Sequence, residues 1–172
     1  MTLKPRQPAP DLEFPLVDGG KWRLADSHPD PFQMIVVYRG LHCPVCKNYL
    51  GELNAKLPEF EKRGVDVVAT SMDGRERAEK AKAEWGLNNL KVGYDLPLAA
   101  AQDWELFISR AVREGETPEF TEPGLFLVRP DGELFFAARG NAPWGRPTFD
   151  QVLRGIDGAV ENKRQARGEA YR

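Results

Sequence analysis

The chain has 172 residues, 41% of them hydrophobic and 29% charged, which is the composition of a globular domain with a substantial core. Its formal net charge of −2 leaves no basic excess to neutralise phosphates, which argues against a nucleic-acid-binding protein. The first residues carry no apolar signal core and no later apolar run could span a bilayer, so we expect a cytoplasmic protein with no membrane partner.

The N-terminal part of the sequence predicts a hairpin followed by a buried strand. Residues 1–12 are rich in proline and are expected to be extended. The segments 13–17 and 21–24 flank Asp18-Gly19-Gly20, a pattern that is typical of a β-hairpin. Gln33–Tyr38 is a nearly continuous apolar run, which predicts a strand buried on both faces of a sheet.

A strand–helix–strand unit comes next. A helix is predicted over Pro44–Lys62, because proline suits a first helical turn and apolar residues then recur at helical spacing. Pro58 lies inside this segment and predicts a kink or break near residues 56–57. Val65–Ser71 has the pattern of a second buried strand, so the two strands should be parallel with a right-handed crossover.

The middle of the chain has weaker patterns. A polar helix is predicted over residues 73–85, a short edge strand over 91–94 and a short helix over 96–104. Residues 105–123 show no regular pattern. This region is therefore expected to be the least regular part of the protein.

The C-terminal part predicts a second hairpin and a last helix. Strands over 125–128 and 133–138 flank Arg129-Pro130-Asp131-Gly132, a strong turn signal. Thr148–Arg164 is predicted to be a helix with its threonine as N-cap, and residues 166–172 should form a frayed, charged tail. The inner face of that helix is predicted to consist of Phe149, Val152, Leu153, Ile156 and Val160.

These elements predict a single domain over residues 1–172, because no repeat, low-complexity tract or linker divides the chain. Central parallel strands and a C-terminal antiparallel hairpin make a mixed sheet, and helices on both faces make a three-layer α/β domain with an N-terminal β-hairpin. This order of elements, with a C-x-x-C motif closing the first buried strand, resembles that of thioredoxin-like folds.

The C-x-x-C motif consists of Cys43 and Cys46, the only two cysteines, at the junction of a strand and a helix. A thiolate is the competent nucleophile, and unpaired N–H groups at a helix N-terminus favour it over the thiol. We therefore assign Cys43 as the nucleophile and Cys46 as the resolving thiol. Pro44 stiffens the turn between them, and a protonated His42 or the nearby Arg39 would lower the pKa of Cys43 further.

Two other interpretations of the cysteines stay open. A zinc site would need further ligands, but the chain has only two histidines and no other cysteine, so neither a metal nor a cofactor is expected. Free cysteines also pack well in protein cores, so the pair could be structural. The position at a strand-to-helix junction favours redox chemistry over both.

Four further segments of the sequence carry a resemblance to a known family. They are Ala9-Pro10-Asp11-Leu12-Glu13-Phe14-Pro15-Leu16, Val36 to Cys46 with its Cys-Pro-Val-Cys end, Val67-Val68-Ala69-Thr70-Ser71-Met72-Asp73, and Pro123-Gly124-Leu125-Phe126-Leu127-Val128-Arg129-Pro130-Asp131-Gly132. These segments, which together cover about residues 8–140, resemble the peroxiredoxin-like AhpC/TSA (redoxin) family. A thioredoxin-like, peroxiredoxin-like fold and thiol-dependent chemistry are what this resemblance implies.

The sequence departs from the family at three positions. Peroxiredoxins carry P-x-x-x-T/S-x-x-C, and here Val36 and Gly40 stand at the proline and threonine positions. Pro123 stands where the family has its peroxide-binding arginine. Proline at that place resembles thioredoxin-type oxidoreductases, which implies a cis Glu122–Pro123 bond facing the two cysteines. The competing interpretation is that Pro123 only begins an edge strand.

Other residues are weighed as supporting groups. Candidates for the missing arginine's role are Arg39, Arg110, Arg139 and Arg146, and each is predicted to be a solvated surface charge. Trp144 is predicted to pack under the last helix, with a cover over the redox site as the alternative. Asp66 is expected at the end of the sheet rather than buried below the cysteines, and Glu52 is expected to be exposed.

The sequence thus predicts a thiol-dependent oxidoreductase that cycles a Cys43–Cys46 dithiol and disulfide to reduce disulfides or peroxides, an antioxidant role. The expected partners are a disulfide or peroxide substrate and a thioredoxin-like or other dithiol reductant. The resemblance to the family also allows a homodimer. A non-catalytic redox-sensing or protein-interaction module on the same fold is the alternative.

Overall fold

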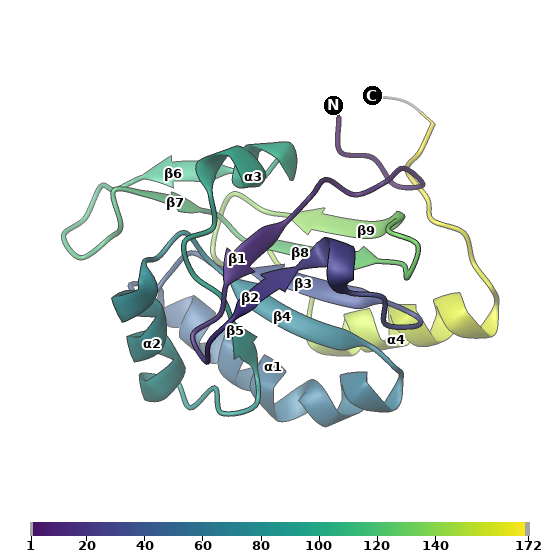
Figure 1. Ribbon diagram of the computed structural model, residues 1–172, viewed down its shortest axis with the longest axis horizontal. Coiled ribbons are helices and arrows are strands. Elements are labelled where there is room, and N and C mark those ends of the chain that lie inside the picture. The colour runs from purple at the N-terminus through teal and green to yellow at the C-terminus, as the bar shows by residue number, and fades with distance from the viewer. Residues whose placement is uncertain (1, 171–172) are drawn as a thin grey trace.

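A five-stranded mixed sheet forms the centre of the protein in the computed structural model, which describes residues 2–170 (Figure 1). The strand order is β5-β4-β3-β8-β9. Strands β3, β4 and β5 are parallel, β8 is antiparallel to β3, and β9 is antiparallel to β8. The strands are β3 (Gln33–Val37), β4 (Asp66–Thr70), β5 (Lys91–Val92), β8 (Gly124–Val128) and β9 (Leu134–Arg139).

Other elements cover both faces of this sheet, which confirms the predicted three-layer architecture (Figure 1). Helices α1 (Pro44–Lys62) and α4 (Phe149–Glu161) pack against one face. The opposite face is covered by the N-terminal hairpin and α3 (Leu98–Asp103). The hairpin consists of β1 (Glu13–Pro15) and β2 (Lys21–Arg23), and further elements are the 3₁₀ helix η1 (Leu24–Asp26) and α2 (Arg75–Glu84).

Strand β3 is buried on both sides because its side chains alternate between two cores. Met34 and Val36 belong to the core under α1 and α4, whereas Ile35 and Val37 belong to the core on the hairpin side. A period of two places successive side chains on opposite faces, so an unbroken apolar run is what such a strand requires. The strand predicted over 33–38 and its parallel pairing with β4 are both confirmed.

Helix α1 has the predicted bounds, but it runs through Pro58 without a break. Proline removes one backbone hydrogen bond from a helix, a cost that packing can outweigh. Leu57 and Phe60 are buried on either side of it, and Pro58 itself is exposed, so its ring faces solvent. The predicted break is therefore wrong, because burial of the helix's apolar face holds the last turn in place.

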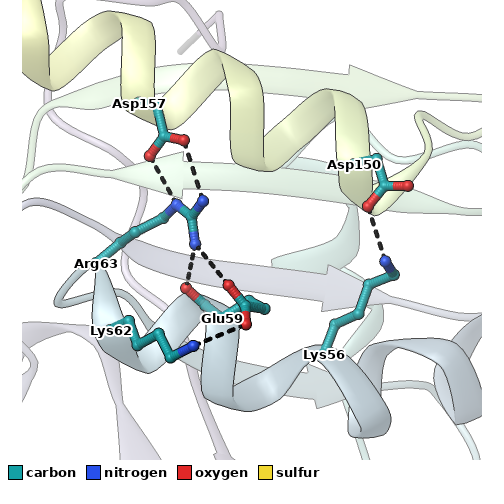
Figure 2. A network of polar contacts seen from close by, with 6 residues as sticks. All are labelled: Lys56, Glu59, Lys62, Arg63, Asp150 and Asp157. Atoms are coloured by element: carbon teal, nitrogen blue, oxygen red, sulfur yellow. Dashed lines mark hydrogen bonds and ion pairs between the residues drawn. The ribbon is translucent and has the colours of Figure 1, made fainter.

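Charged side chains also join α1 to α4 at the molecular surface (Figure 2). Arg63 donates from Nε to Asp157 Oδ1 at 2.6 Å and from Nη2 to Asp157 Oδ2 at 3.0 Å. Lys56 Nζ donates to Asp150 Oδ1 at 2.7 Å. Exposed pairs of this kind contribute little stability, so the apolar seam beneath them is the main contact between the helices.

The segment 105–123 contains a hairpin that the sequence pattern did not reveal. Strands β6 (Ile108–Arg110) and β7 (Glu119–Thr121) pair in antiparallel fashion and carry a long connection away from the central sheet (Figure 1). Three-residue strands joined by a polar connection have no alternation long enough to detect. This hairpin places Glu122 and Pro123 directly before β8.

The C-terminal helix begins as predicted, with Thr148 as N-cap and a capping box completed by Gln151. One inner position differs, because Val160 is exposed by 53% and Ala159 is buried in its place. The predicted tail is also packed at its start, where Ala166 is buried, while its last two residues lie outside the described part. None of the helices in residues 2–170 is long and apolar enough to cross a bilayer.

Candidate active site

Cys43 occupies the N-cap position of α1, where the chain leaves β3 and turns into the helix. Its backbone is extended, and its Sγ accepts a hydrogen bond from the Cys46 N–H at 3.2 Å. Both cysteines are free thiols, and each is at most 1% exposed. The Cys43 sulfur therefore replaces the capping oxygen that a serine or aspartate would supply, and it receives the unpaired N–H of the first turn.

These donors stabilise the Cys43 thiolate. Hydrogen bonding from the Cys46 side chain and its N–H, together with the Arg39 and Arg146 guanidinium groups, lowers the pKa of Cys43 to about 6. Burial acts in the opposite direction but is outweighed. At neutral pH the nucleophilic form of Cys43 is therefore the main one, which supports its sequence-based assignment.

Cys46 is the opposite case, because burial raises the pKa of its thiol far above the usual value. The adjacent Cys43 adds to that rise, since a thiolate beside it disfavours a second negative charge. The pair thus combines one ionised sulfur with one protonated sulfur a single helical turn away. A dithiol of this kind has a nucleophile and a resolving thiol with distinct roles.

Arg146 reaches the buried cysteine from the loop between β9 and α4. Its Nη2 lies 2.7 Å from Cys46 Sγ, and its guanidinium lies over the Tyr49 ring at 4.7 Å. Tyr49 in turn donates a hydrogen bond from its hydroxyl to the Pro147 carbonyl at 2.7 Å, which holds this loop against α1. The prediction that Arg146 is a solvated surface charge is wrong, because the loop folds back over the first turn of the helix.

Arg39 is also held in place beside the cysteines. Its Nε donates to Glu122 Oε2 at 2.9 Å, and its guanidinium lies 5.0 Å from the centre of the Phe120 ring. Glu122 is 4% exposed and accepts a further hydrogen bond from Ser109 Oγ at 2.7 Å. The Glu122 carboxylate was missed by sequence reasoning, because only the β6–β7 hairpin brings Ser109 and Glu122 together.

His42 does not act as the sequence suggested. Burial, followed by the nearby Arg39 charge, lowers its pKa below the ordinary histidine value, so the ring is neutral at neutral pH. Its ring meets Phe120 edge-on at 4.7 Å, and neither ring nitrogen has a hydrogen-bond partner within the described chain. The lowered pKa therefore argues against activation of Cys43 by a protonated His42.

Gly40, at the position of the family's threonine, is required by its surroundings. Its φ of 143° is one that side chains rarely adopt, and a Cβ there would lie 2.8 Å from Asp73 Oδ1. The wholly buried Asp73 accepts hydrogen bonds from the Leu41 N–H at 2.7 Å and from Thr117 Oγ1 at 2.6 Å. Asp73 thus anchors the loop before Cys43, a role that no local motif indicated.

The two prolines of the predicted site have different outcomes. Pro44 is the first residue of α1, as predicted, and is exposed. Pro123 is buried, and its carbonyl accepts a hydrogen bond from the Gly140 N–H at 3.1 Å. The Asp30–Pro31 bond is the one cis peptide in residues 2–170, so the Glu122–Pro123 bond is trans and the expected cis geometry is wrong.

The other residues considered from the sequence either lie away from the two sulfurs or form other contacts. Arg110 is a solvated charge as predicted, whereas Arg139 is paired with Glu105 at 2.8 Å. Trp144 is 81% exposed and does not pack under α4. Asp66 forms an ion pair with Lys91 at the start of β4, which confirms the sheet-end position, and Glu52 is exposed as expected.

In the part of the chain that is described, no three His, Cys, Asp or Glu side chains could together hold a metal.

Comparison with known proteins identifies the family. The AhpC/TSA family model matches residues 5–137, which is most of the chain. This protein belongs to the AhpC/TSA family. Its relatives include a 1-Cys peroxiredoxin of Dictyostelium discoideum, 29% identical over 141 residues, and Peroxiredoxin-6 of Gallus gallus, 28% identical over 170 residues. These matches cover 81% and 87% of this chain and 53% and 69% of the relatives, so the chain spans about half the length of the first.

Solved structures confirm the fold of this AhpC/TSA protein. Peroxiredoxin 6 of Arenicola marina superposes with a TM-score of 0.78 at 21% identity and covers 99% of this chain and 80% of its own. The reduced 2-Cys peroxiredoxin of Plasmodium vivax gives a TM-score of 0.77 at 18% identity, over 94% of this chain and 99% of its own. The thioredoxin-like, peroxiredoxin-like architecture predicted from the sequence is therefore correct.

Proposed function

We propose that this AhpC/TSA protein is a thiol peroxidase, in which Cys43 reduces a small peroxide and Cys46 resolves the oxidised product. The observation that carries the proposal is the pairing of an ionised Cys43 with a protonated Cys46 one turn away at the start of α1. Relatives that are named peroxiredoxins support the same chemistry.

The reaction balances with these two sulfurs. The Cys43 thiolate attacks one peroxide oxygen, the O–O bond breaks, and the leaving oxygen takes a proton to form water or an alcohol. Cys43 is then a sulfenic acid. Cys46 attacks the Cys43 sulfur, and water leaves as the Cys43–Cys46 disulfide forms. Two electrons and two protons from an external dithiol restore the starting state.

The burial of Cys43 favours a small substrate. Its side chain is 1% exposed, so a disulfide within a folded protein cannot reach Sγ in line without displacing the surrounding loops. A hydroperoxide needs to present only two oxygen atoms. Protein-disulfide reduction is the second candidate, because Gly40 and Pro123 stand where the family has its threonine and arginine.

The reductant is proposed to be a thioredoxin-like protein or another dithiol. One structural neighbour, the yeast mitochondrial 1-Cys peroxiredoxin, is described as being resolved through glutathione and thioredoxin systems. A location in the cytoplasm suits this cycle, since both thiols must be returned to the reduced state. A homodimer is a further expectation, and sedimentation velocity of the purified protein tests it directly.

The deciding experiment measures hydrogen peroxide consumption with dithiothreitol as reductant, beside insulin-disulfide reduction, for the wild type, Cys43→Ser and Cys46→Ser. We expect peroxide consumption by the wild type, none by Cys43→Ser, and a trapped sulfenic acid without internal disulfide in Cys46→Ser. Arg110→Gln is the matched control, because Arg110 is solvated. Absence of both activities supports the non-catalytic module instead, whereas activity that survives in Cys43→Ser refutes the assignment of Cys43 as the nucleophile.

A further inference from the structure

Arg146 makes its one side-chain hydrogen bond within residues 2–170 to a reacting atom, the sulfur of Cys46. The Nη2–Sγ distance of 2.7 Å is short for a contact with sulfur, and Cys46 itself is wholly buried. The contact joins two segments a hundred residues apart, the first turn of α1 and the loop before α4. It follows that the loop delivers a positive charge to this sulfur.

The charge of Arg146 has no carboxylate to balance it. Within residues 2–170 no acidic side chain forms an ion pair with Arg146, and its Nε is buried without a hydrogen-bond partner. Its other neighbour is the face of Tyr49, which stabilises a cation but carries no charge. A partly buried cation in such surroundings favours the formation of an anion beside it, and Cys46 is the ionisable group it touches.

We infer that Arg146 is a catalytic residue of the resolving step, in which its guanidinium stabilises the Cys46 thiolate that attacks oxidised Cys43. This inference rests on the proposed function and adds Arg146 to the residues that act in it. In the step, the Cys46 sulfur supplies the electron pair of the new S–S bond. The S–O bond of the Cys43 sulfenic acid breaks, and the hydroxide that leaves takes up a proton to become water.

The arrangement also sets the order of events. While Cys43 is a thiolate, burial keeps the proton on Cys46, and the hydrogen bond and charge of Cys43 add to this effect. Conversion of Cys43 to a neutral sulfenic acid removes that negative charge. The positive charge of Arg146 lowers the pKa of Cys46, and burial is then the main effect that raises it. The Cys46 thiolate is therefore easier to form after Cys43 has been oxidised than before.

The other ionisable groups near the two cysteines do not supply this effect. Tyr38, at the end of β3, has its pKa raised by burial and stays neutral, so it offers no positive charge. Tyr49 on α1 is likewise held neutral by burial. Arg39 is paired with Glu122 and acts on Cys43 rather than on Cys46. Arg146 is thus the cation that the structure directs at the resolving sulfur.

The first test follows the resolving step alone. Reduced protein is mixed with one equivalent of hydrogen peroxide, and the sulfenic acid and the internal disulfide are quantified over time across pH. Loss of an opposite charge raises a pKa by about 1–3 units, and the greater nucleophilicity of the more basic thiolate recovers about half of the resulting loss on a logarithmic scale. Arg146→Gln should therefore slow disulfide formation about 3–30-fold below the pKa of Cys46, with sulfenic acid accumulating and the pH profile displaced upward.

Two comparison variants separate chemistry from structure. Arg129→Gln removes another partly buried guanidinium, which lies over the Phe135 ring at 4.6 Å in the β8–β9 hairpin, and it should resolve at the wild-type rate. Arg146→Lys keeps the charge and should restore much of the rate and the pH profile. A pH profile in Arg146→Gln that matches the wild type overturns the inference, as does an equal loss in both Gln variants.

A second test does not depend on peroxidase activity. The Cys46 thiolate is titrated by its ultraviolet absorbance in Cys43→Ser and in Cys43→Ser with Arg146→Gln, with the variant lacking both cysteines as the blank. We expect the Cys46 pKa to be about 1–3 units higher without Arg146. Equal pKa values refute the role of Arg146 even if peroxide is reduced, whereas a shift without peroxide reduction means that the proposed function alone fails.

Discussion

The two ends of helix α1 carry polar contacts of similar length in opposite surroundings. At the C-terminal end, Arg63 meets Asp157 at 2.6 Å on the surface, and Lys56 meets Asp150 at 2.7 Å (Figure 2). At the N-terminal end, Arg146 meets the wholly buried sulfur of Cys46 at 2.7 Å. The distances are nearly equal, but water screens the first contacts and hardly reaches the last.

This difference shows that burial, rather than distance, decides what a polar contact does in this protein. Exposed ion pairs contribute about 0–1 kcal/mol, because solvent screens them and holding two long side chains costs entropy. A charge next to a buried thiol changes its pKa by whole units. The contacts at the C-terminal end of α1 therefore add little to the packing of α1 against α4, whereas those at the N-terminal end change the ionisation of the two thiols.

The largest effect is expected from Cys43→Ser, which removes the nucleophile from the buried end of the helix. Peroxide turnover should fall by more than about 1000-fold, since burial keeps the one remaining thiol, that of Cys46, protonated. A steady-state peroxide assay measures the loss, and circular dichroism confirms the fold. Turnover within tenfold of the wild type would assign the chemistry to another residue.

Gly40→Ala tests the backbone of the loop that precedes the N-terminal end of α1. Alanine at a φ of 143° is strained, and its Cβ would crowd the Asp73 carboxylate at 2.8 Å. We expect a loss of about 1–3 kcal/mol in the free energy of unfolding by urea denaturation, together with slower Cys43 oxidation. Gly51→Ala, a helical glycine with open space around its Cα, is the control and should not lose stability. Equal stability of the Gly40→Ala and wild-type proteins would contradict the close packing between Gly40 and Asp73.

The pH dependence of Cys43 alkylation by iodoacetamide gives a third comparison. Because hydrogen bonding from Cys46, with help from Arg39 and Arg146, lowers the pKa of Cys43 to about 6, the rate should rise through that pH and level off above it. Arg39→Gln should move the curve upward by about one unit. A half-maximal rate near pH 8.5, the value of a free thiol, would contradict thiolate stabilisation.

The smallest effect is expected at the exposed end. Arg63→Gln breaks the contacts with Asp157 and Glu59, yet it should change the free energy of unfolding by less than about 1 kcal/mol. Thermal unfolding at low and high salt measures this change, and the difference between the two proteins should shrink as salt screens the charges. A loss above 2 kcal/mol would show that the surface network matters as much as the buried one.

Local patterns in the sequence were sufficient for several elements. The bounds of α1 follow from a proline at its first position and apolar residues at helical spacing, and both hairpin turns follow from Asp-Gly signals. The sequence did not predict the three-residue strands β6 and β7, because nothing within 105–123 distinguishes a short strand from a loop. The break predicted at Pro58 was wrong for a related reason, because the local cost of a proline inside a helix says nothing about the tertiary packing that outweighs it.

The C-x-x-C spacing at the start of a helix was enough to predict Cys43 as the nucleophile and Cys46 as the resolving thiol, because hydrogen bonds within one helical turn act locally. The charges around the two sulfurs depend on the folded chain. Arg146 reaches Cys46 across 100 positions, Glu122 holds Arg39 across 83, and Asp73 fills the space at Gly40. Such contacts depend on chain folding, which no spacing along the sequence records.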